Sequence, residues 1–355
     1  MLLTDRRNLL QSFALGAAAA ALPLAANAST SRSPAPASPP PMLLAPRLKA
    51  GDTIGLISPC AATFETERFS IAAETLQALG FKVKEGRHAR ARRGHFAGTD
   101  AQRAQDLNDM FSDPQVQGIL AMTGGSGATR ILNLLDYAEI QRNPKFFGGY
   151  SDITALLNAI RTRTGLVTFH APMGVSEWNE FSTRYFRSVL MNGDSTVFSN
   201  PQNHEGLLTQ TGERTQTIRG GKARGPLLGS NLSVLTTLLG TPYCPDFKGA
   251  ILFLEDINEY IYRVDRMLAH LKQAGALDSL GGVVLGQFTD CKPGEGFGSL
   301  TLEEVFADYF RDLNIPVYSG AMFGHVRHKF TLPVGLPVEI DADRGTITQL
   351  QAAVR

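Results

Sequence analysis

Serine, histidine and carboxylate side chains at the ends of predicted strands give this chain the parts of a nucleophilic catalyst. Ser151 lies in residues 146–160, FFGGYSDITALLNAI, where an apolar run ends at two glycines and the residues after Asp152 follow helical spacing. A strand that turns abruptly into a helix lifts the serine hydroxyl off the sheet edge, close to unpaired N–H groups of the helix. The segment predicts a nucleophile elbow, although it carries only half of the motif GxSxG. A simple helix N-cap at Ser151 is the alternative.

A serine hydroxyl needs a base that accepts its proton and an acid that fixes the tautomer of that base. Glu255 follows the predicted buried strand 250–254, AILFL, and therefore lies at a strand end. His325 follows Gly324 in a predicted loop. These two residues are the predicted acid and base.

Other residues compete for both roles. Asp256 and Glu259 are the rival acids, and acids at this point also suit the N-terminus of a helix. His170 and His328 stay open as bases. The histidines at 325 and 328 have the spacing HxxH, but no third ligand cluster accompanies them, so no metal is predicted.

Strands and helices alternate in the first half of the chain, which predicts the sheet that positions the serine. Strands are expected at 53–57, 81–83, 116–122, 146–149 and within 166–173, with helices between them. This order implies a parallel sheet with right-handed crossovers, and ligands bind such sheets at the carboxyl ends of the strands. The glycine-rich corners at 123–127 and 148–151 fall at that edge.

The corner at 123–127, TGGSG, has two interpretations. It lacks the GK[ST] and GxGxxG patterns of nucleotide-binding loops, so its exposed N–H groups are better suited to an oxyanion than to a nucleotide. A tight turn that needs positive φ at glycine is the alternative.

The second half begins near Gly225 and continues the alternation. Helices are expected at 231–239, from about 261 and at 302–310, with strands at 250–254, 282–285 and 317–318 and two short strands at the end. Residues 176–222 are polar and are expected to be an irregular linker that walls a cleft.

Composition restricts the class of protein. The chain has 355 residues, 43% of them hydrophobic, which is enough for two globular domains. Its formal net charge of +1 disfavours nucleic-acid binding, and the basic run at 87–93 is expected to be a solvated loop. The three cysteines have no metal-ligand spacing.

Residues 1–28 have the features of an export signal. Arg6 and Arg7 precede an alanine-rich apolar run, and residues 26–28, ANA, form a cleavage signal, as in twin-arginine signals. A membrane anchor is the alternative, but the run is shorter than the roughly 20 residues a span needs and contains Pro23. Cleavage would leave a periplasmic protein without membrane attachment. Residues 29–47, rich in proline and serine, are expected to be an extended tether.

Five motifs in the same order give the chain its resemblance to a known family. They are residues 124–125 (GG), 148–152 (GGYSD), 229–242 ending in Thr-Pro, 254–259 (LEDINE) and 324–335, which begins with GH and ends with LPVG. From about Leu48 onward the chain resembles the LD-carboxypeptidase family of serine peptidases, which includes muramoyltetrapeptide carboxypeptidases and microcin C immunity hydrolases. The resemblance implies an α/β fold, with a Rossmann-like parallel-sheet N-terminal domain at 48–173, a linker at 174–224 and a smaller α/β C-terminal domain at 225–355. The active site would lie between the two domains.

The same resemblance implies roles for particular residues. Ser151 would be the nucleophile, His325 the base and Glu255 the orienting acid, with the backbone N–H groups of Asp152 and Gly125 as the oxyanion hole. Substrate contacts are expected near Gly124 and Ser126, and the terminal carboxylate of a substrate needs a cation, for which Arg130 and Arg263 are candidates. The loop reads GGSG where relatives often have an aromatic residue after the glycines, so this chain departs from the family pattern at Ser126.

The resulting hypothesis is hydrolysis, without a metal or other cofactor, of an L,D-peptide bond in a murein peptide, with release of the terminal D-alanine. A related hydrolase that cleaves another acyl or carboxamide bond is one alternative. A periplasmic solute-binding protein that closes on its ligand without chemistry is the other. A homodimer also stays open.

Overall fold

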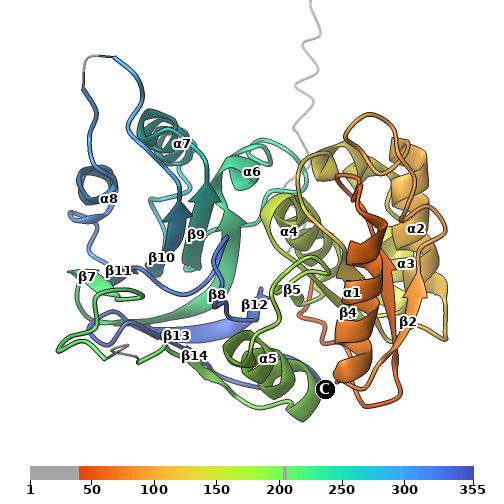
Figure 1. The fold of residues 1–355 in the computed structure, drawn as a ribbon. Coiled ribbons are helices and arrows are strands. Elements are labelled where there is room, and N and C mark those ends of the chain that lie inside the picture. The colour runs from red at the N-terminus through yellow and green to blue at the C-terminus, as the bar shows by residue number, and fades with distance from the viewer. Residues whose placement is uncertain (1–39, 203–205, 297) are drawn as a thin grey trace, which may run out of the picture. The chain divides into compact units, whose positions relative to one another are not determined.

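The structure, a computed structural model, describes residues 40–202, 206–296 and 298–355, which belong to one compact unit (Figure 1). The predicted export signal and residues 29–39 of the predicted tether lie outside the described residues. None of the described helices is long and apolar enough to cross a membrane. The three cysteines are all unpaired.

Five strands from the first half of the chain and β12 from the second form a six-stranded sheet in the order β12-β5-β4-β3-β1-β2. Strands β1 to β5 are mutually parallel, as the alternating pattern predicts, and β12 is antiparallel to β5. Their bounds are Thr53–Ile57 (β1), Lys82–Glu85 (β2), Gly118–Ala121 (β3), Phe146–Gly149 (β4), Thr168–His170 (β5) and Leu332–Val334 (β12).

Helices connect the parallel strands, and the local sequence explains where α2 begins and where α4 ends. Thr99 caps α2 with a full capping box to Gln102, and Gly165 ends α4 in the left-handed conformation. The helical elements of this half are α1 (Thr66–Ala78), α2 (Asp100–Ser112), the 3-10 helix η1 (Ala128–Leu134), α3 (Tyr137–Arg142), the 3-10 turn η2 (Ser151–Ile153) and α4 (Thr154–Thr164).

An eight-stranded sheet forms the second half, in the order β6-β14-β13-β8-β9-β10-β11-β7. Its centre, β8 to β11, is parallel, and the outer strands are antiparallel to their neighbours. The strands are β6 (Val197–Phe198), β7 (Gln216–Arg219), β8 (Lys222–Asn231), β9 (Ile251–Ile257), β10 (Gly282–Thr289), β11 (Val317–Ser319), β13 (Pro337–Asp341) and β14 (Thr346–Gln349). The helices are α5 (Glu180–Phe186), the π-helix η3 (Arg187–Asn192), α6 (Leu232–Thr236), α7 (Ile261–Gln273) and α8 (Leu302–Phe310). Together the two sheets confirm the expected fold class, an α/β protein with a Rossmann-like parallel sheet and a second α/β domain.

The helix expected after the loop at 123–127 forms as the 3-10 helix η1, which a spacing of three residues also suits. Two local expectations are wrong. The segment 176–222 is not irregular, because it contains α5, η3, β6 and β7. The strand expected to end at 254 continues to Ile257, because Glu255 pairs with Asn231 of β8 and Asp256 with Phe288 of β10. The domain boundaries drawn at 173–174 and 224–225 stay predictions.

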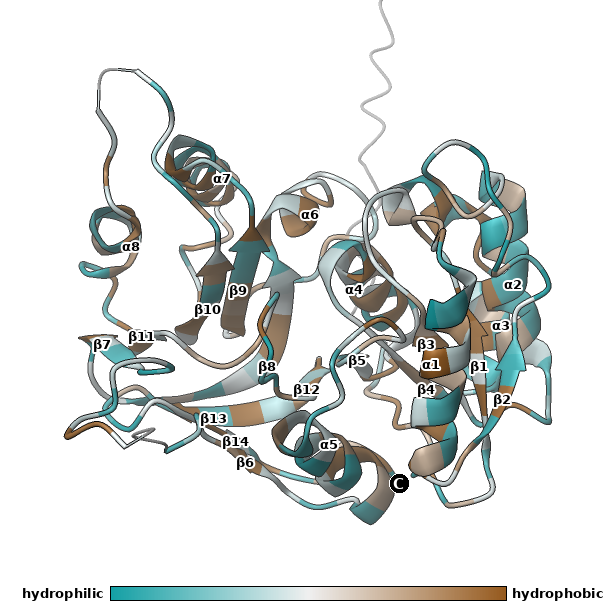
Figure 2. Cartoon of the chain, in the orientation of Figure 1, coloured by the Kyte–Doolittle hydropathy of each residue, from teal (hydrophilic) through white to brown (hydrophobic). Residues whose placement is uncertain are grey.

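The two halves share one hydrophobic core. Figure 2 shows β9 and β10 largely in the hydrophobic colour, with a hydrophilic band toward the carboxyl end of β9, where the sequence reads Glu255-Asp256. Both of these acids are buried. A buried carboxylate is costly unless it finds hydrogen-bond partners, so the partners of this pair indicate where the chemistry lies.

Candidate active site

Ser151 occupies the sharp turn that the sequence predicts. Strand β4 ends at Gly149, and Ser151 begins η2, which leads directly into α4. Its φ of 63° is a left-handed conformation that residues other than glycine adopt at a cost. A β-carbon on Gly124 would lie 2.7 Å from the Ser151 β-carbon and 2.9 Å from its hydroxyl oxygen, so only a glycine fits opposite the serine.

Glu255 and His325 form a hydrogen-bonded pair. The Glu255 side chain is fully buried on β9, and its Oε2 lies 2.8 Å from His325 Nδ1. Its other oxygen, Oε1, has no hydrogen-bond partner among the described residues. Gly324 brings the histidine this close, since its φ is +102° and a β-carbon there would lie 2.7 Å from Glu255 Oε2. The Thr289 hydroxyl donates to the His325 carbonyl over 3.1 Å and holds the loop from the other side.

Contacts between the two halves place His325 against the residue before the serine. The His325 ring packs edge-on against Tyr150, the residue before Ser151, with 5.0 Å between ring centroids. Helix α4, which follows Ser151, binds β8 directly. Asn158 Nδ2 donates to the Gly229 carbonyl over 2.9 Å, and the backbone N–H of Asn231 donates to Thr154 Oγ1 over 3.1 Å. In Figure 1, α4 lies beside α6 and the upper end of β8. No hydrogen bond between Ser151 and His325 is found in the described part of the chain, whereas the bond from His325 to Glu255 is formed.

The glycine-rich loop at 123–127 lies against the serine turn. The Ala61 amide donates to the Gly124 carbonyl over 3.1 Å, and the position of a β-carbon on Gly124 is 3.3 Å from the Asp152 amide nitrogen. The Asp152 carboxylate accepts a hydrogen bond from the Ala128 amide over 2.8 Å and so fastens the end of the loop to the serine turn. Among the turn, loop and cap hydrogen bonds of the described residues, none is donated by the amide of Gly125 or Asp152. The predicted oxyanion hole, the amides of Gly125 and Asp152, therefore has no acceptor among these bonds.

The rival acids have other partners. The Asp256 carboxylate accepts hydrogen bonds from the amides of Ser233 and Ile257, each over 2.8 Å, and from Asn231 Nδ2 over 3.1 Å. Burial, reinforced by neighbouring Glu255, raises the pKa of Asp256 to about 6. Glu259 pairs with Arg263 over 3.5 Å. Of the three acids in this segment, Glu255 alone binds His325.

The rival histidines also have other partners. His328 Nδ1 lies 2.6 Å from Glu213 Oε1, so the two histidines of HxxH bind different carboxylates. In the described residues no group of three or more histidine, cysteine, aspartate or glutamate side chains is arranged to hold a metal ion. His170 is fully buried between the two sheets.

The predicted substrate-binding residues are only partly brought together. Ser126 lies in the glycine-rich loop, and its hydroxyl is 3.0 Å from His95 Nε2, a contact that the sequence did not indicate. The Arg130 side chain is 52% exposed and pairs with Asp100 over 2.7 Å. The Arg263 side chain is 51% exposed, and its described partners are Glu259 and neighbouring tyrosines. Neither arginine contacts the serine, the acid or the base among the described contacts.

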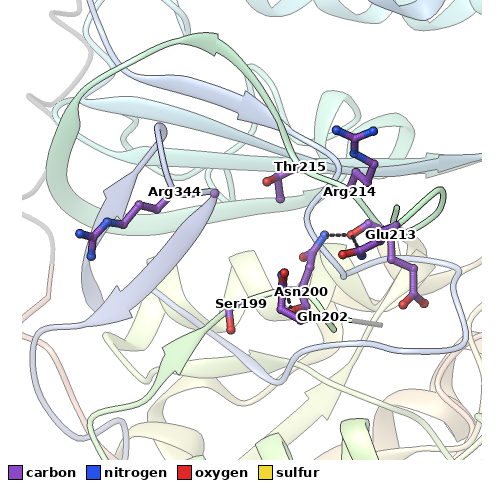
Figure 3. Close-up of a pocket in the computed structure, with 9 residues that line it drawn as sticks. Ser199, Asn200, Gln202, Glu213, Arg214, Thr215 and Arg344 are labelled. Carbon is purple, nitrogen blue, oxygen red and sulfur yellow. Dashed lines mark hydrogen bonds between the residues drawn. The ribbon is translucent and has the colours of Figure 1, made fainter. Parts of the chain in front are cut away.

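Four cavities of the described surface lie elsewhere. The one in Figure 3 has a volume of about 180 Å³ and is lined by polar side chains, with the Asn200 amide group donating to the Glu213 carbonyl over 2.7 Å. The others, of about 280, 570 and 480 Å³, lie at α5 and His328, at α8 and the ends of β10 and β11, and at the amino ends of β1 and β4. Ser151, Glu255 and His325 line none of these four.

Comparison with known proteins places this arrangement in a family. Residues 54–171 match the LD-carboxypeptidase N-terminal domain, and residues 224–340 match the LD-carboxypeptidase C-terminal domain. The chain belongs to the LD-carboxypeptidase family. The family that the five motifs resemble is thereby confirmed.

Three individual proteins illustrate the likeness. The probable murein peptide carboxypeptidase of Bacillus subtilis (strain 168) is 37% identical over 293 residues, which is 81% of this chain and 88% of that protein. The microcin C7 self-immunity protein MccF of Escherichia coli is 31% identical over 335 residues, 87% of this chain and 95% of that protein. The crystal structure of muramoyltetrapeptide carboxypeptidase from Oxalobacter formigenes has a TM-score of 0.72 at 29% identity, covering 83% of this chain and 97% of the other.

Proposed function

We propose that this chain is an exported serine carboxypeptidase that hydrolyses an L,D-peptide bond and releases the terminal D-alanine of murein tetrapeptides. The observation that carries the proposal is the hydrogen bond of 2.8 Å between His325 Nδ1 and the buried Glu255, formed beside the strained turn at Ser151. The names of the relatives from B. subtilis and O. formigenes support a murein peptide as the substrate.

In the proposed mechanism the acid fixes the tautomer of the base. A carboxylate only accepts hydrogen bonds, so His325 Nδ1 carries the proton and Nε2 presents a lone pair. Nε2 takes the proton of the Ser151 hydroxyl as its oxygen attacks the scissile carbonyl. The amides of Asp152 and Gly125 then bind the oxygen that becomes negatively charged.

The second half of the reaction reuses the same groups. His325 gives its proton to the leaving amine, which departs as D-alanine and leaves an acyl-enzyme on Ser151. A water molecule, deprotonated by His325, hydrolyses that ester and regenerates the serine. Buried Glu255 stabilises the imidazolium formed in each half-reaction.

The first test is the reaction itself. Mature protein is incubated with tri-, tetra- and pentapeptide muropeptides, and the products are identified by mass. We expect loss of one alanine from the tetrapeptide, abolished in Ser151→Ala. Full release of D-alanine by Ser151→Ala would refute the mechanism.

A second candidate is hydrolysis of another acyl-peptide or carboxamide, which the identity of 31% to the microcin immunity protein favours. A panel of acyl-peptides assayed beside the muropeptide separates the two, because the preferred substrate has the higher kcat/KM. A solute-binding protein is excluded if a fluorophosphonate labels the protein and the labelling is lost in His325→Ala.

The place of action is also part of the proposal. The paired arginines, the apolar run and the ANA signal support export by the twin-arginine route and a periplasmic role in the turnover of cell-wall fragments. Fractionation of cells that carry the full chain tests this, with Arg6→Lys and Arg7→Lys together expected to retain the protein in the cytoplasm.

A further inference from the structure

His170 binds both the second sheet and the loop that carries the base. It is the last residue of β5, and its ring is fully buried. Nδ1 lies 2.6 Å from the hydroxyl oxygen of Ser230 on β8. The Gly324 amide, one residue before His325, donates to Nε2 over 3.2 Å.

These contacts determine the tautomer of His170. Nε2 accepts a hydrogen bond from an amide, so it carries no proton, and a neutral ring then holds its proton on Nδ1 and donates it to the Ser230 hydroxyl. Burial lowers the pKa of His170 to about 3, and the charges of His325 and Lys329 act in the same direction. Tyr150 is the other titratable group against the ring, with 5.7 Å between ring centroids. Burial and the bond from the Gly324 amide thus both favour the neutral ring.

The position of His170 in the fold gives these bonds a role. Gly229, Ser230 and Asn231 are consecutive on β8, and each is bound from the nucleophile side, by Asn158, His170 and Thr154 respectively. Of these three residues on the nucleophile side, only His170 also contacts the base loop, residues 320–331 between β11 and β12, through the Gly324 amide. Its ring thus connects the sheet that carries Ser151, the strand beside Glu255 and the backbone next to His325.

We propose that His170 is a positioning residue for the hydrolysis: it holds the Gly324 amide and so fixes the His325 ring between Glu255 and Ser151. This inference rests on the proposed function and deepens it. Gly324 has a φ of +102°, and a β-carbon there would lie 2.7 Å from Glu255 Oε2. Glycine adopts many backbone conformations, so a hydrogen bond to its amide restricts the position of the loop. His170 supplies that bond from the opposite sheet.

Three variants separate this role from simple packing. His170→Gln places an amide oxygen near the position of Nε2 and keeps an acceptor for the Gly324 amide. His170→Asn keeps a donor toward Ser230 but is too short to reach Gly324, and His170→Phe keeps the ring volume without either bond. The matched control is Thr168→Val on the same strand, which removes a buried hydrogen bond of 3.0 Å from the Thr168 hydroxyl to the Leu157 carbonyl, on α4 rather than on the loop of His325.

The measurements are kcat and KM for the tetrapeptide, normalised to sites labelled by a fluorophosphonate, and the pH profile of kcat/KM. We expect kcat to fall about 100-fold in His170→Phe and His170→Asn with little change in KM, because misplacing a catalytic group by about 1 Å costs that much. The acid limb of the profile shifts to lower pH in both variants, since a displaced imidazolium is less well stabilised by Glu255. His170→Gln restores most of kcat, and Thr168→Val leaves kcat and the profile unchanged.

Each outcome decides one question. Equal kcat and an unshifted profile in His170→Asn and His170→Gln would overturn the positioning role while the parent enzyme stays active. If His170→Phe does not fold, the comparison of glutamine with asparagine decides alone. A parent protein that neither releases D-alanine nor reacts with the fluorophosphonate would instead refute the proposed function.

Discussion

Replacing Glu255 by glutamine tests the centre of the proposed site with almost no change in volume. The carboxylate is fully buried, its Oε1 has no partner among the described residues, and Oε2 binds His325 over 2.8 Å. The one hydrogen bond found for this carboxylate among the described residues is therefore the bond to an imidazole. An amide at this position removes the charge and, if its NH₂ group faces Nδ1, selects the tautomer that cannot accept the serine proton.

The size of the effect follows from the geometry. Charge centres about 4 Å apart interact by about 4 kcal/mol at an effective dielectric constant near 20, and this stabilisation belongs to the imidazolium of the transition state. Its loss corresponds to about a 10³-fold fall in kcat, at 1.36 kcal/mol for each factor of ten. Stability should change little or rise, because a buried charge carries a desolvation cost that glutamine avoids.

The assay is release of D-alanine from the tetrapeptide, with thermal unfolding measured on the same preparations. Glu339→Gln is the control, since it removes a carboxylate that pairs with Arg224 over 2.6 Å on the outer part of the second sheet. A Glu255→Gln enzyme that keeps more than about a tenth of kcat would show that less than 1.4 kcal/mol depends on the acid and would refute the triad. A larger loss in Asp256→Asn would transfer the role of the acid to its neighbour.

Three further predictions concern the proposed oxyanion hole in the glycine-rich loop, the candidate ligand Arg130 and the buried Lys329. Gly125→Ala should lower kcat by about 10²- to 10³-fold with little effect on KM. The reason is that φ at Gly125 is +101° and the new β-carbon would lie 2.5 Å from that of Ala61, so the backbone must shift. An unchanged single-turnover rate would show that the Gly125 amide is not part of the oxyanion hole. Arg130→Ala should raise KM less than about fivefold, since Asp100 already binds the exposed guanidinium; a larger rise would make Arg130 the carboxylate ligand. Burial lowers the pKa of Lys329 from 10.5 to about 8, so the unfolded chain binds more protons between these values and stability rises with pH there. Urea unfolding is measured at pH 7, 9 and 10 for the parent and for Lys329→Met. Across this range the free energy of unfolding of the parent should rise by up to about 3 kcal/mol relative to that of the variant. If the two free energies of unfolding change in parallel with pH, the burial of the Lys329 amine is contradicted.

Local patterns were enough to predict several elements, among them the turn that holds Ser151. The strand at 53–57 and the helix at 302–310 have the predicted bounds, and the run from Phe146 through Ser151 into α4 forms the predicted turn. Each of these segments has apolar periodicity with glycine, serine or threonine at its ends, so the signal lies within a few neighbouring residues. The choice of Glu255 and His325 was likewise limited to strand ends and loops, and the structure joins these two residues.

What the sequence could not predict depends on partners distant in the chain. Leu332 to Val334 form β12 beside β5, more than 150 residues away, and nothing within a three-residue strand encodes that partner. The sequence left His170 open as a base, and nothing near it in the chain indicates its bonds to Ser230 and Gly324. Asp256 could not be separated from Glu255 by type or spacing; only the direction of each side chain distinguishes them.

The contacts between the two sheets bear on the alternative of a solute-binding protein. A protein that closes on a ligand by hinge motion needs lobes joined by a few segments that can bend. Here β12 crosses from the second half of the chain into the first sheet, and three consecutive residues of β8 are bonded to the nucleophile side. Opening such an interface would break buried hydrogen bonds, each costly when left unsatisfied. A fixed interface suits the proposed catalyst, in which Ser151 follows a strand of the first sheet and Glu255, the partner of the base, lies on the second. Their relative position must be held closely for proton transfer.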